Sequence, residues 1–182
     1  MRNPAITLML FASVQIGAIL TPPTASAQQP APPPYPLDAI PDKMPFPTPY
    51  GAPISLASAQ AAIAAAQAEA DKHGWPLNIA VVDSGANLVA FARMDGAQLA
   101  SIAIAEHKAR ASASFRRPTR VFEESLQKQD YKYVLTLDGI IASRGGIPLI
   151  VDGKLIGAIG CSGGTGSQDE VVCTAGAAAI NK

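Results

Sequence analysis

The chain has 182 residues, and its 14 Lys and Arg balance 14 Asp and Glu, so the formal net charge is zero. This balance argues against a nucleic-acid partner, which requires a basic surface. The two histidines and two cysteines provide too few ligands for a zinc site. The length is sufficient for one domain with a real hydrophobic core.

Residues 1–27 have the pattern of a secretory signal peptide. Arg2 precedes an apolar core over 6–20, and Ala25-Ser26-Ala27 forms a small-residue cleavage site. A membrane span needs about 20 uninterrupted apolar residues, and Pro22-Pro23 follows this core too soon. We therefore expect a periplasmic or secreted protein, with no stable membrane span after cleavage.

A proline-rich segment follows the signal sequence. Ten of the chain's 16 prolines lie within 28–53, where apolar periodicity is almost absent. This composition predicts an extended, polyproline-like tether over 28–54, acting as a spacer or a loosely packed arm. The domain is then expected to occupy residues 55–182.

The first half of this domain shows helix, hairpin and helix signals in turn. Ser55 is positioned to cap a helix that runs to about His73, where Gly74 stops it. Strands are expected over 77–82 and 88–93, joined by five turn-forming residues. A helix over 98–115, which Pro118 ends, and a short helix over 121–128 come next.

The second half is dominated by two apolar runs that Asp152-Gly153 joins within 147–159. Asp-Gly between such runs favours a type I′ hairpin. The preceding 131–143 region is ambiguous, although its β-branched and aromatic residues favour a strand over 133–137. A last helix is expected over 167–180, with capping-box spacing between Ser167 and Glu170.

Consecutive hairpins, with helices before, between and after them, predict an α/β fold. We expect an antiparallel sheet covered by helices, a profilin- or PAS-like layered sandwich. Cys161 and Cys173 would form a disulfide if the last helix folded back over the preceding strand, and the sequence leaves that pairing open.

The order of several short motifs resembles the GlcG/HbpS family, also called the haem-degrading domain. The matching pieces are residues 79–83 with Gly85, Arg93-Met94-Asp95-Gly96, Lys108-Ala109, Arg117-Pro118-Thr119, Gly145-Gly146-Ile147-Pro148, Asp152-Gly153, residues 156–160, and Ser162-Gly163-Gly164 followed by Gln168-Asp169. The resemblance implies an α/β domain that assembles into homo-oligomers, with some members exported and binding haem. A haem- or tetrapyrrole-binding protein, haem-degrading or redox-sensing, is the leading hypothesis.

Haem iron takes an axial side chain such as His, Cys, Met or Tyr. His107 and His73 are the two histidine candidates, and the iron of a haem is the one metal expected. His107 also suits the surface of a helix, and His73 suits the end of a helix, where basic residues face the last carbonyls.

A basic cluster lies around the end of the central helix, formed by Lys108, Arg110, Arg116, Arg117 and Arg120. Arginine binds carboxylates through two parallel hydrogen bonds, so this cluster is a candidate clamp for haem propionates or an aromatic acid. Arg116, Arg117 and Thr119 are the cofactor-binding candidates. Solvated basic residues at a helix end remain the alternative.

A cofactor-independent lyase or isomerase is the second hypothesis, acting on a small carboxylated aromatic or hydroxy-acid substrate. Arg93, Lys108 or Arg117 would then hold the carboxylate. Asp95, Glu106 or His107 would move a proton. A third possibility is a structural or sensory protein whose oligomer is its function.

Overall fold

A computed structural model describes residues 40–182 of the chain. The predicted signal peptide and the first part of the predicted tether lie outside the described residues. Within the part that is described, every helix is too short or too polar to cross a membrane.

Four antiparallel strands form one sheet: β1 (Asn78–Asp83), β2 (Leu88–Arg93), β3 (Gly146–Val151) and β4 (Lys154–Ser162). Their spatial order is β2-β1-β4-β3. Central strands β1 and β4 lie in a register that pairs Val81 with Ile159. Asp152 and Gly153 both have positive φ, 50° and 70°, as a type I′ turn requires.

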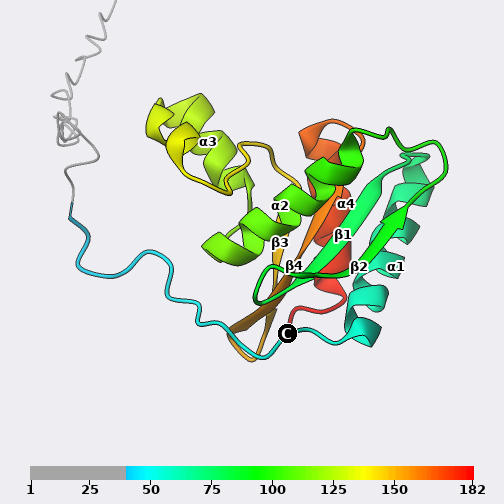
Figure 1. Ribbon diagram of the computed structural model, residues 1–182, viewed down its shortest axis with the longest axis horizontal. Helices are drawn as coiled ribbons and strands as arrows, with labels where there is room; N and C mark the ends of the chain where they lie inside the picture. The colour runs from blue at the N-terminus through cyan, green and yellow to red at the C-terminus, as the bar shows by residue number, and fades with distance from the viewer. Residues whose placement is uncertain (1–39) are drawn as a thin grey trace, which may run out of the picture. The chain divides into compact units, whose positions relative to one another are not determined.

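Helices cover both faces of the sheet (Figure 1). Helices α1 (Leu56–His73) and α4 (Gly166–Ala178) pack on one face. Helix α2 (Ser101–Phe115) packs on the other, and α3 (Arg120–Gln129) follows it. The layered α/β sandwich expected from the sequence is therefore confirmed.

Two glycines allow α2 to lie directly on the sheet. A side chain at Gly160 would meet the carbonyl oxygen of Ala105, and one at Gly146 would meet that of Lys108. The backbone of α2 therefore approaches β3 and β4 more closely than side chains would permit. This contact fixes the position of Lys108 in the middle of the helix.

The ends of α1 are those expected. Ser55 accepts a hydrogen bond from the amide of Ser58, and Gly74 takes the left-handed conformation with φ of 64°. Helix α2 ends at Phe115 as expected, but it begins at Ser101, later than expected. The capping box of α4 uses Thr165 and Gln168 rather than Ser167 and Glu170.

The strand expected over 133–137 is wrong. Residues Lys132–Thr136 form a 3-10 helix, η2, because no neighbouring strand pairs with this segment. Of its residues, Val134 is buried, while Leu135 is 64% exposed. Strand propensity alone does not form a strand here, because this segment pairs with no strand of the sheet.

Residues 46–54, at the end of the predicted tether, form an arm packed against the domain. The amide of Gly51 donates a hydrogen bond to the carbonyl of Leu155 at 2.7 Å, and the hydroxyl of Tyr50 donates one to the backbone carbonyl of Ser114 at 2.6 Å. Ile54 is 6% exposed and belongs to the core. The ordered domain therefore begins before the expected boundary at residue 55.

Cys161 and Cys173 form a disulfide between β4 and α4, with their Cα atoms 5.6 Å apart. Both side chains are fully buried. The pairing that the sequence left open is therefore made, because α4 folds back over the end of β4.

Candidate functional site

A buried ion pair joins α2 to α4. Lys108 Nζ donates a hydrogen bond to Asp169 Oδ2 at 2.7 Å, and the two residues are 1% and 2% exposed. Charged groups are rarely buried to this extent unless they are paired. We had expected Lys108 to be part of an accessible basic cluster, and its burial removes it from that cluster.

The carboxylate of Asp169 is also bound by the loop that precedes α4. Its Oδ1 accepts a hydrogen bond from the amide of Gly164 at 3.1 Å. Burial raises the pKa of Asp169 above its ordinary value, although Lys108 and the loop amides act in the opposite direction. The loop amides and Lys108 thus hold Asp169 in one position.

A second set of charges lies over the start of α4. Arg144 donates to Glu123 Oε1 through Nε at 2.8 Å and contacts Glu170 at 3.4 Å. Burial alone would raise the pKa of Glu123, but the hydrogen bonds from Arg144 lower it below its ordinary value. Arg120 reaches the same Glu170 at 3.5 Å and also pairs with Glu124. These contacts tie α3 to α4.

Thr119 lies close to the buried pair, because Thr119 and Lys108 both lie against Gly146. It is fully buried, its hydroxyl accepts from the amide of Gly146 at 2.9 Å, and its own amide donates to the Gly146 carbonyl. A side chain at Gly145 would come within 3.2 Å of Lys108 Nζ. Thr119 therefore has a structural contact and no exposed surface for a cofactor.

His107 lies on α2 next to Lys108, but it is half-buried rather than enclosed. Its side chain forms no hydrogen bond with any other residue in the described part of the chain. Its neighbour Glu106 accepts from Arg110 at 2.9 Å across one helical turn. The imidazole nitrogens of His107 are therefore available to a ligand.

Arg116 and Arg117 contact the arm rather than forming a free clamp. Arg116 donates to the Thr48 carbonyl at 2.9 Å, and its guanidinium lies 5.2 Å from the ring centre of Tyr50. The Arg117 guanidinium lies 3.1 Å from the ring centre of Phe46. Burial, and then the charge of Arg116, lower the pKa of Arg117.

The remaining candidates lie at a different place in the fold. His73 ends α1, where its Nε2 lies 3.2 Å from Glu69 Oε1 and its ring stacks on Trp75 with centroids 4.2 Å apart. Arg93 and Asp95, at the end of β2, line a hollow with residues of α1. The structure therefore does not gather the proposed enzyme residues into one constellation.

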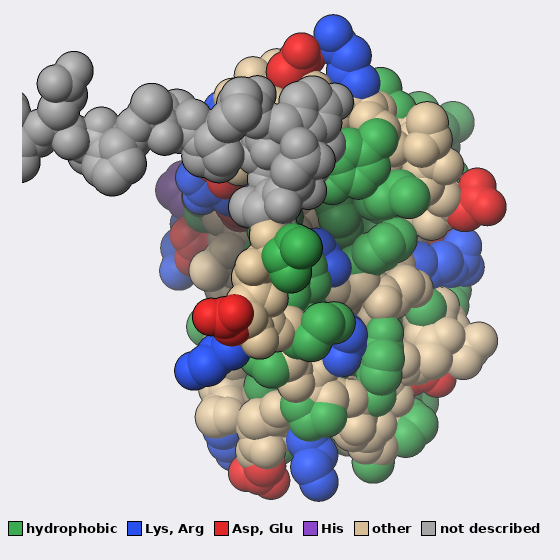
Figure 2. Space-filling model, turned by 90° about the vertical axis from the view of Figure 1, so that its left-hand side faces the viewer, with side chains coloured by type: hydrophobic (Ala, Val, Ile, Leu, Met, Phe, Trp, Pro, Cys, Tyr) green, Lys and Arg blue, Asp and Glu red, His purple; other side chains and the backbone are tan. Residues whose placement is uncertain are grey.

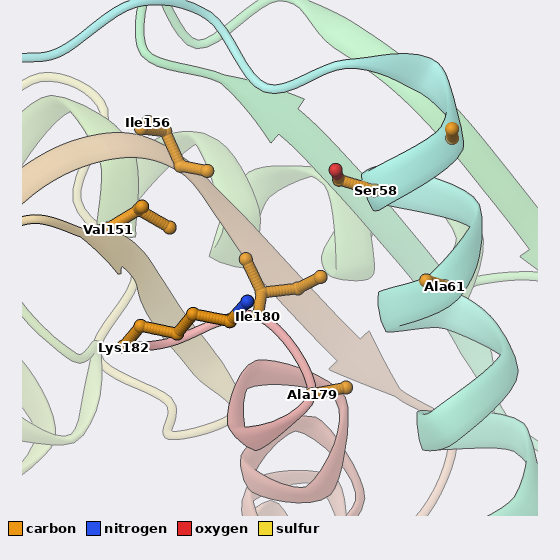
Figure 3. Close-up of a pocket in the computed structure, with 8 residues that line it drawn as sticks. Ser58, Ala61, Val151, Ile156, Ala179, Ile180 and Lys182 are labelled. Carbon is orange, nitrogen blue, oxygen red and sulfur yellow. The ribbon is translucent and has the colours of Figure 1, made fainter.

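An open, largely apolar hollow of about 460 Å³ lies between the start of α1 and the end of α4 (Figure 3). Val151 and Ile156 form its floor from β3 and β4, and Ile180 and Lys182 close one side. None of the candidate residues lines this hollow.

Within residues 40–182, no group of three or more His, Cys, Asp and Glu side chains is arranged to hold a metal ion. The disulfide also makes both cysteines unavailable as thiolate ligands. Among the described histidines, His107 is the one without an intramolecular partner for its ring.

Sequence reasoning missed the pairing of Asp169 with Lys108 and of Glu123 with Arg144. Asp169 was recognised within a family motif, but no sequence pattern indicates a partner 61 residues away. Glu123 and Arg144 carried no motif at all. Their 21-residue separation crosses η2, whose path the sequence did not predict.

These features define an α/β sandwich protein whose helices are joined by a buried Lys-Asp pair. The family model described as "Haem degrading protein HbpS-like" matches residues 54–178, and the chain belongs to this family. Protein GlcG of Escherichia coli is 42% identical over 109 residues, which are 60% of this chain and 81% of GlcG.

Solved structures agree with this assignment. Protein ORFY of Klebsiella pneumoniae superposes with a TM-score of 0.68 and 29% identity, over 76% of this chain and 97% of ORFY. A PduOC:haem complex superposes with a TM-score of 0.65 and 29% identity, over 71% of this chain and 96% of that one. The fold and the family resemblance expected from the sequence are therefore confirmed.

Proposed function

We propose that this protein binds haem, with His107 on α2 as the axial ligand. The observation that carries the proposal is the similarity to PduOC, a protein solved as a complex with haem. Bound haem would supply redox chemistry at its iron, the basis of a haem-degrading or redox-sensing role.

The surroundings of the two histidines favour His107 over His73. The His73 ring stacks on Trp75 and its Nε2 contacts Glu69, so ligation of iron through Nε2 would break that hydrogen bond and disturb the stacking contact. Ligation of iron by His107 would break no such contact with a described residue. The disulfide leaves no cysteine thiolate to compete with it.

Arg110 is the basic residue best placed to meet a haem propionate beside His107. It lies one turn further along α2 and is exposed, and its pairing with Glu106 is a surface contact. Such pairs contribute about 0–1 kcal/mol, so a propionate would compete with Glu106 at small cost. The buried Lys108 would contribute to haem binding indirectly, because its ion pair with Asp169 holds the helix that carries His107 and Arg110 in position.

We further propose that the protein self-associates and that a second copy covers the haem. His107 lines none of the three hollows described for this structure, so a haem bound there would rest against the surface of α2. Figure 2 shows apolar side chains exposed among charged ones on one face of the molecule. Exposed apolar residues include Val121, Tyr133, Leu135 and Leu137. Burying them between copies would stabilise an oligomer.

Export to the periplasm or medium is also part of the proposal. Its supports are the signal-peptide pattern of residues 1–27 and the buried disulfide, since disulfides persist mainly in oxidising compartments.

The test is a haem titration of the mature protein followed by visible absorption, with His107→Ala and His73→Ala as matched variants. We expect a saturable Soret shift that His107→Ala abolishes and His73→Ala leaves unchanged. Added imidazole should restore the shift to His107→Ala, because it can occupy the position of the missing ring. Native mass spectrometry of the same samples would report the stoichiometry of chain and haem.

A Soret shift that survives in both variants would disprove ligation by histidine. Absence of any saturable complex with the unchanged protein would disprove haem binding itself. A complex with one haem per isolated chain would disprove the covering second copy.

A further inference from the structure

The end of β2 and the last turns of α1 border two adjoining open hollows, of about 380 and 290 Å³. They share Asp71, Met94 and Asp95 as lining residues. Figure 1 shows the ends of α1 and β2 at the same end of the sheet. Pockets that bind small organic molecules begin at about 300 Å³, so this space suits a small ligand.

Charges of both signs line this space without pairing with one another. Arg93, Asp71 and Asp95 all line the larger hollow, together with Gln67. Within the described residues, none of these four side chains forms an ion pair or a hydrogen bond. An intramolecular surface pair would contribute little, about 0–1 kcal/mol, so leaving the charges separate costs the fold little.

The smaller hollow provides an apolar wall next to these charges. Trp75, Pro76 and Met94 line it, and Trp75 and Met94 also pack against the core. The stacked ring of His73 fixes one face of Trp75. An ammonium group is attracted to a tryptophan ring, and a methylene chain packs well against a thioether.

Rigid elements hold the polar groups in place. Gln67 and Asp71 are four residues apart on α1, so they share a helix face. Arg93 ends β2 in register with Asn78, and the Met94 amide donates to the Leu77 carbonyl at 3.1 Å. The chain then turns through Gly96, whose φ is 83°. The backbone of the site therefore needs little ordering when a ligand binds, which favours affinity.

We infer that this surface, formed by Gln67, Asp71, Trp75, Arg93, Met94 and Asp95, is a binding site for a small zwitterion, an α-amino acid with an apolar side chain. Arg93 holds the carboxylate, since a guanidinium can donate two parallel hydrogen bonds to it. Asp71 and Asp95 hold the ammonium group. The apolar side chain lies against Met94 and Trp75. This site is independent of the haem proposal, because His107 does not line it.

The chain contains one tryptophan, and it lines this site, so the intrinsic fluorescence of Trp75 reports on occupancy. We would titrate the full-length mature protein, free of haem, with L-leucine. Two analogues each lack one charge: isoamylamine has the ammonium without the carboxylate, and 4-methylpentanoate has the carboxylate without the ammonium. Saturation-transfer NMR on the methyl groups of each probe gives a second, independent readout.

We expect saturable binding of leucine, weakened at least about tenfold for either analogue, because each loses one set of charge-assisted hydrogen bonds. Arg93→Gln should weaken leucine binding by a similar factor and leave isoamylamine unaffected. The double variant Asp71→Asn with Asp95→Asn should weaken leucine and spare 4-methylpentanoate. Arg110→Gln and His107→Ala are controls that should leave leucine binding unchanged.

Equal binding of all three probes, or leucine binding that survives both sets of variants, would overturn the inference. Binding of the amine alone would also overturn it, because Arg93 would then have no role. No saturable leucine signal by either readout would overturn it as well, whether or not haem binds.

Discussion

Lys108 on α2 and Asp169 on α4 form a 2.7 Å ion pair, although their helices cover opposite faces of the sheet. The pair lies next to Gly145, which immediately precedes β3, and the loop amide of Gly164 completes the contacts of Asp169. One buried contact therefore joins both helical layers.

Replacing Lys108 by Met should lower the free energy of unfolding by about 3–5 kcal/mol, because it leaves a buried carboxylate without its partner. Urea denaturation followed by circular dichroism measures this. The double variant Lys108→Met with Asp169→Leu should lose less than the sum of the single changes, since both charges are then removed. Lys72→Met, which removes an exposed ion pair, is the control and should change stability by about 0.5 kcal/mol or less. Equal effects of Lys108→Met and Lys72→Met would contradict the importance of the buried pair.

The contact between Glu123 and Arg144 should make stability depend on pH. The folded-state pKa of Glu123 lies below the ordinary glutamate value of 4.5, so its contribution to stability is present above that pH. The contribution is lost as the pH falls through the lower, folded-state pKa. Glu123→Gln should destabilise the protein by about 1–3 kcal/mol at neutral pH, and the difference from the unchanged protein should shrink in acid. Thermal unfolding at a series of pH values from neutral to strongly acidic tests this. A difference that stays constant with pH would exclude the ionised pair as its cause.

Removing the disulfide should destabilise the protein without changing the fold. Cys161→Ala with Cys173→Ala should cost about 2–4 kcal/mol, the usual range for a disulfide closing a short loop. Both sulfurs are buried, so mild reductant should act slowly on the native protein and quickly after denaturation. Thiol labelling with and without urea measures both rates. Rapid labelling under native conditions would contradict the burial of this bond.

The arm over 46–54 should contribute to the stability of the domain. Deletion of residues 1–53 should lower the melting temperature by several degrees relative to deletion of residues 1–41, since it also removes the contacts of Phe46, Tyr50 and Gly51. Tyr50→Phe should account for about 1 kcal/mol through its lost hydrogen bond. Equal melting temperatures for the two deletions would show that the arm does not stabilise the domain.

The parts of this structure that neighbouring residues control were predictable from the sequence. Asp152-Gly153 forms the expected type I′ turn because its residues tolerate positive φ. Ser55 and Gly74 cap α1 for similarly local reasons. Apolar periodicity then placed strands and helices well enough to identify the layered sandwich.

Local signals failed where a distant partner decides the outcome. The β-branched residues of η2 predicted a strand, but a strand needs a neighbouring strand to pair with, and this segment pairs with none of the four strands. Arg93 and Asp95 were candidates for an enzyme site together with residues of the central helix. They instead line a hollow with α1, because β2 is an edge strand and α1 packs beside it.

By itself, the sequence determined the helices, the two hairpins, the family and the candidate side chains, because these depend on residue order and on local geometry. The tertiary structure alone decided which side chains meet. Lys108 became half of a buried ion pair, both cysteines became a disulfide, and His107 kept its ring free of described partners. These outcomes depend on how helices dock across the sheet, and that docking brings together Lys108 and Asp169, which are 61 positions apart.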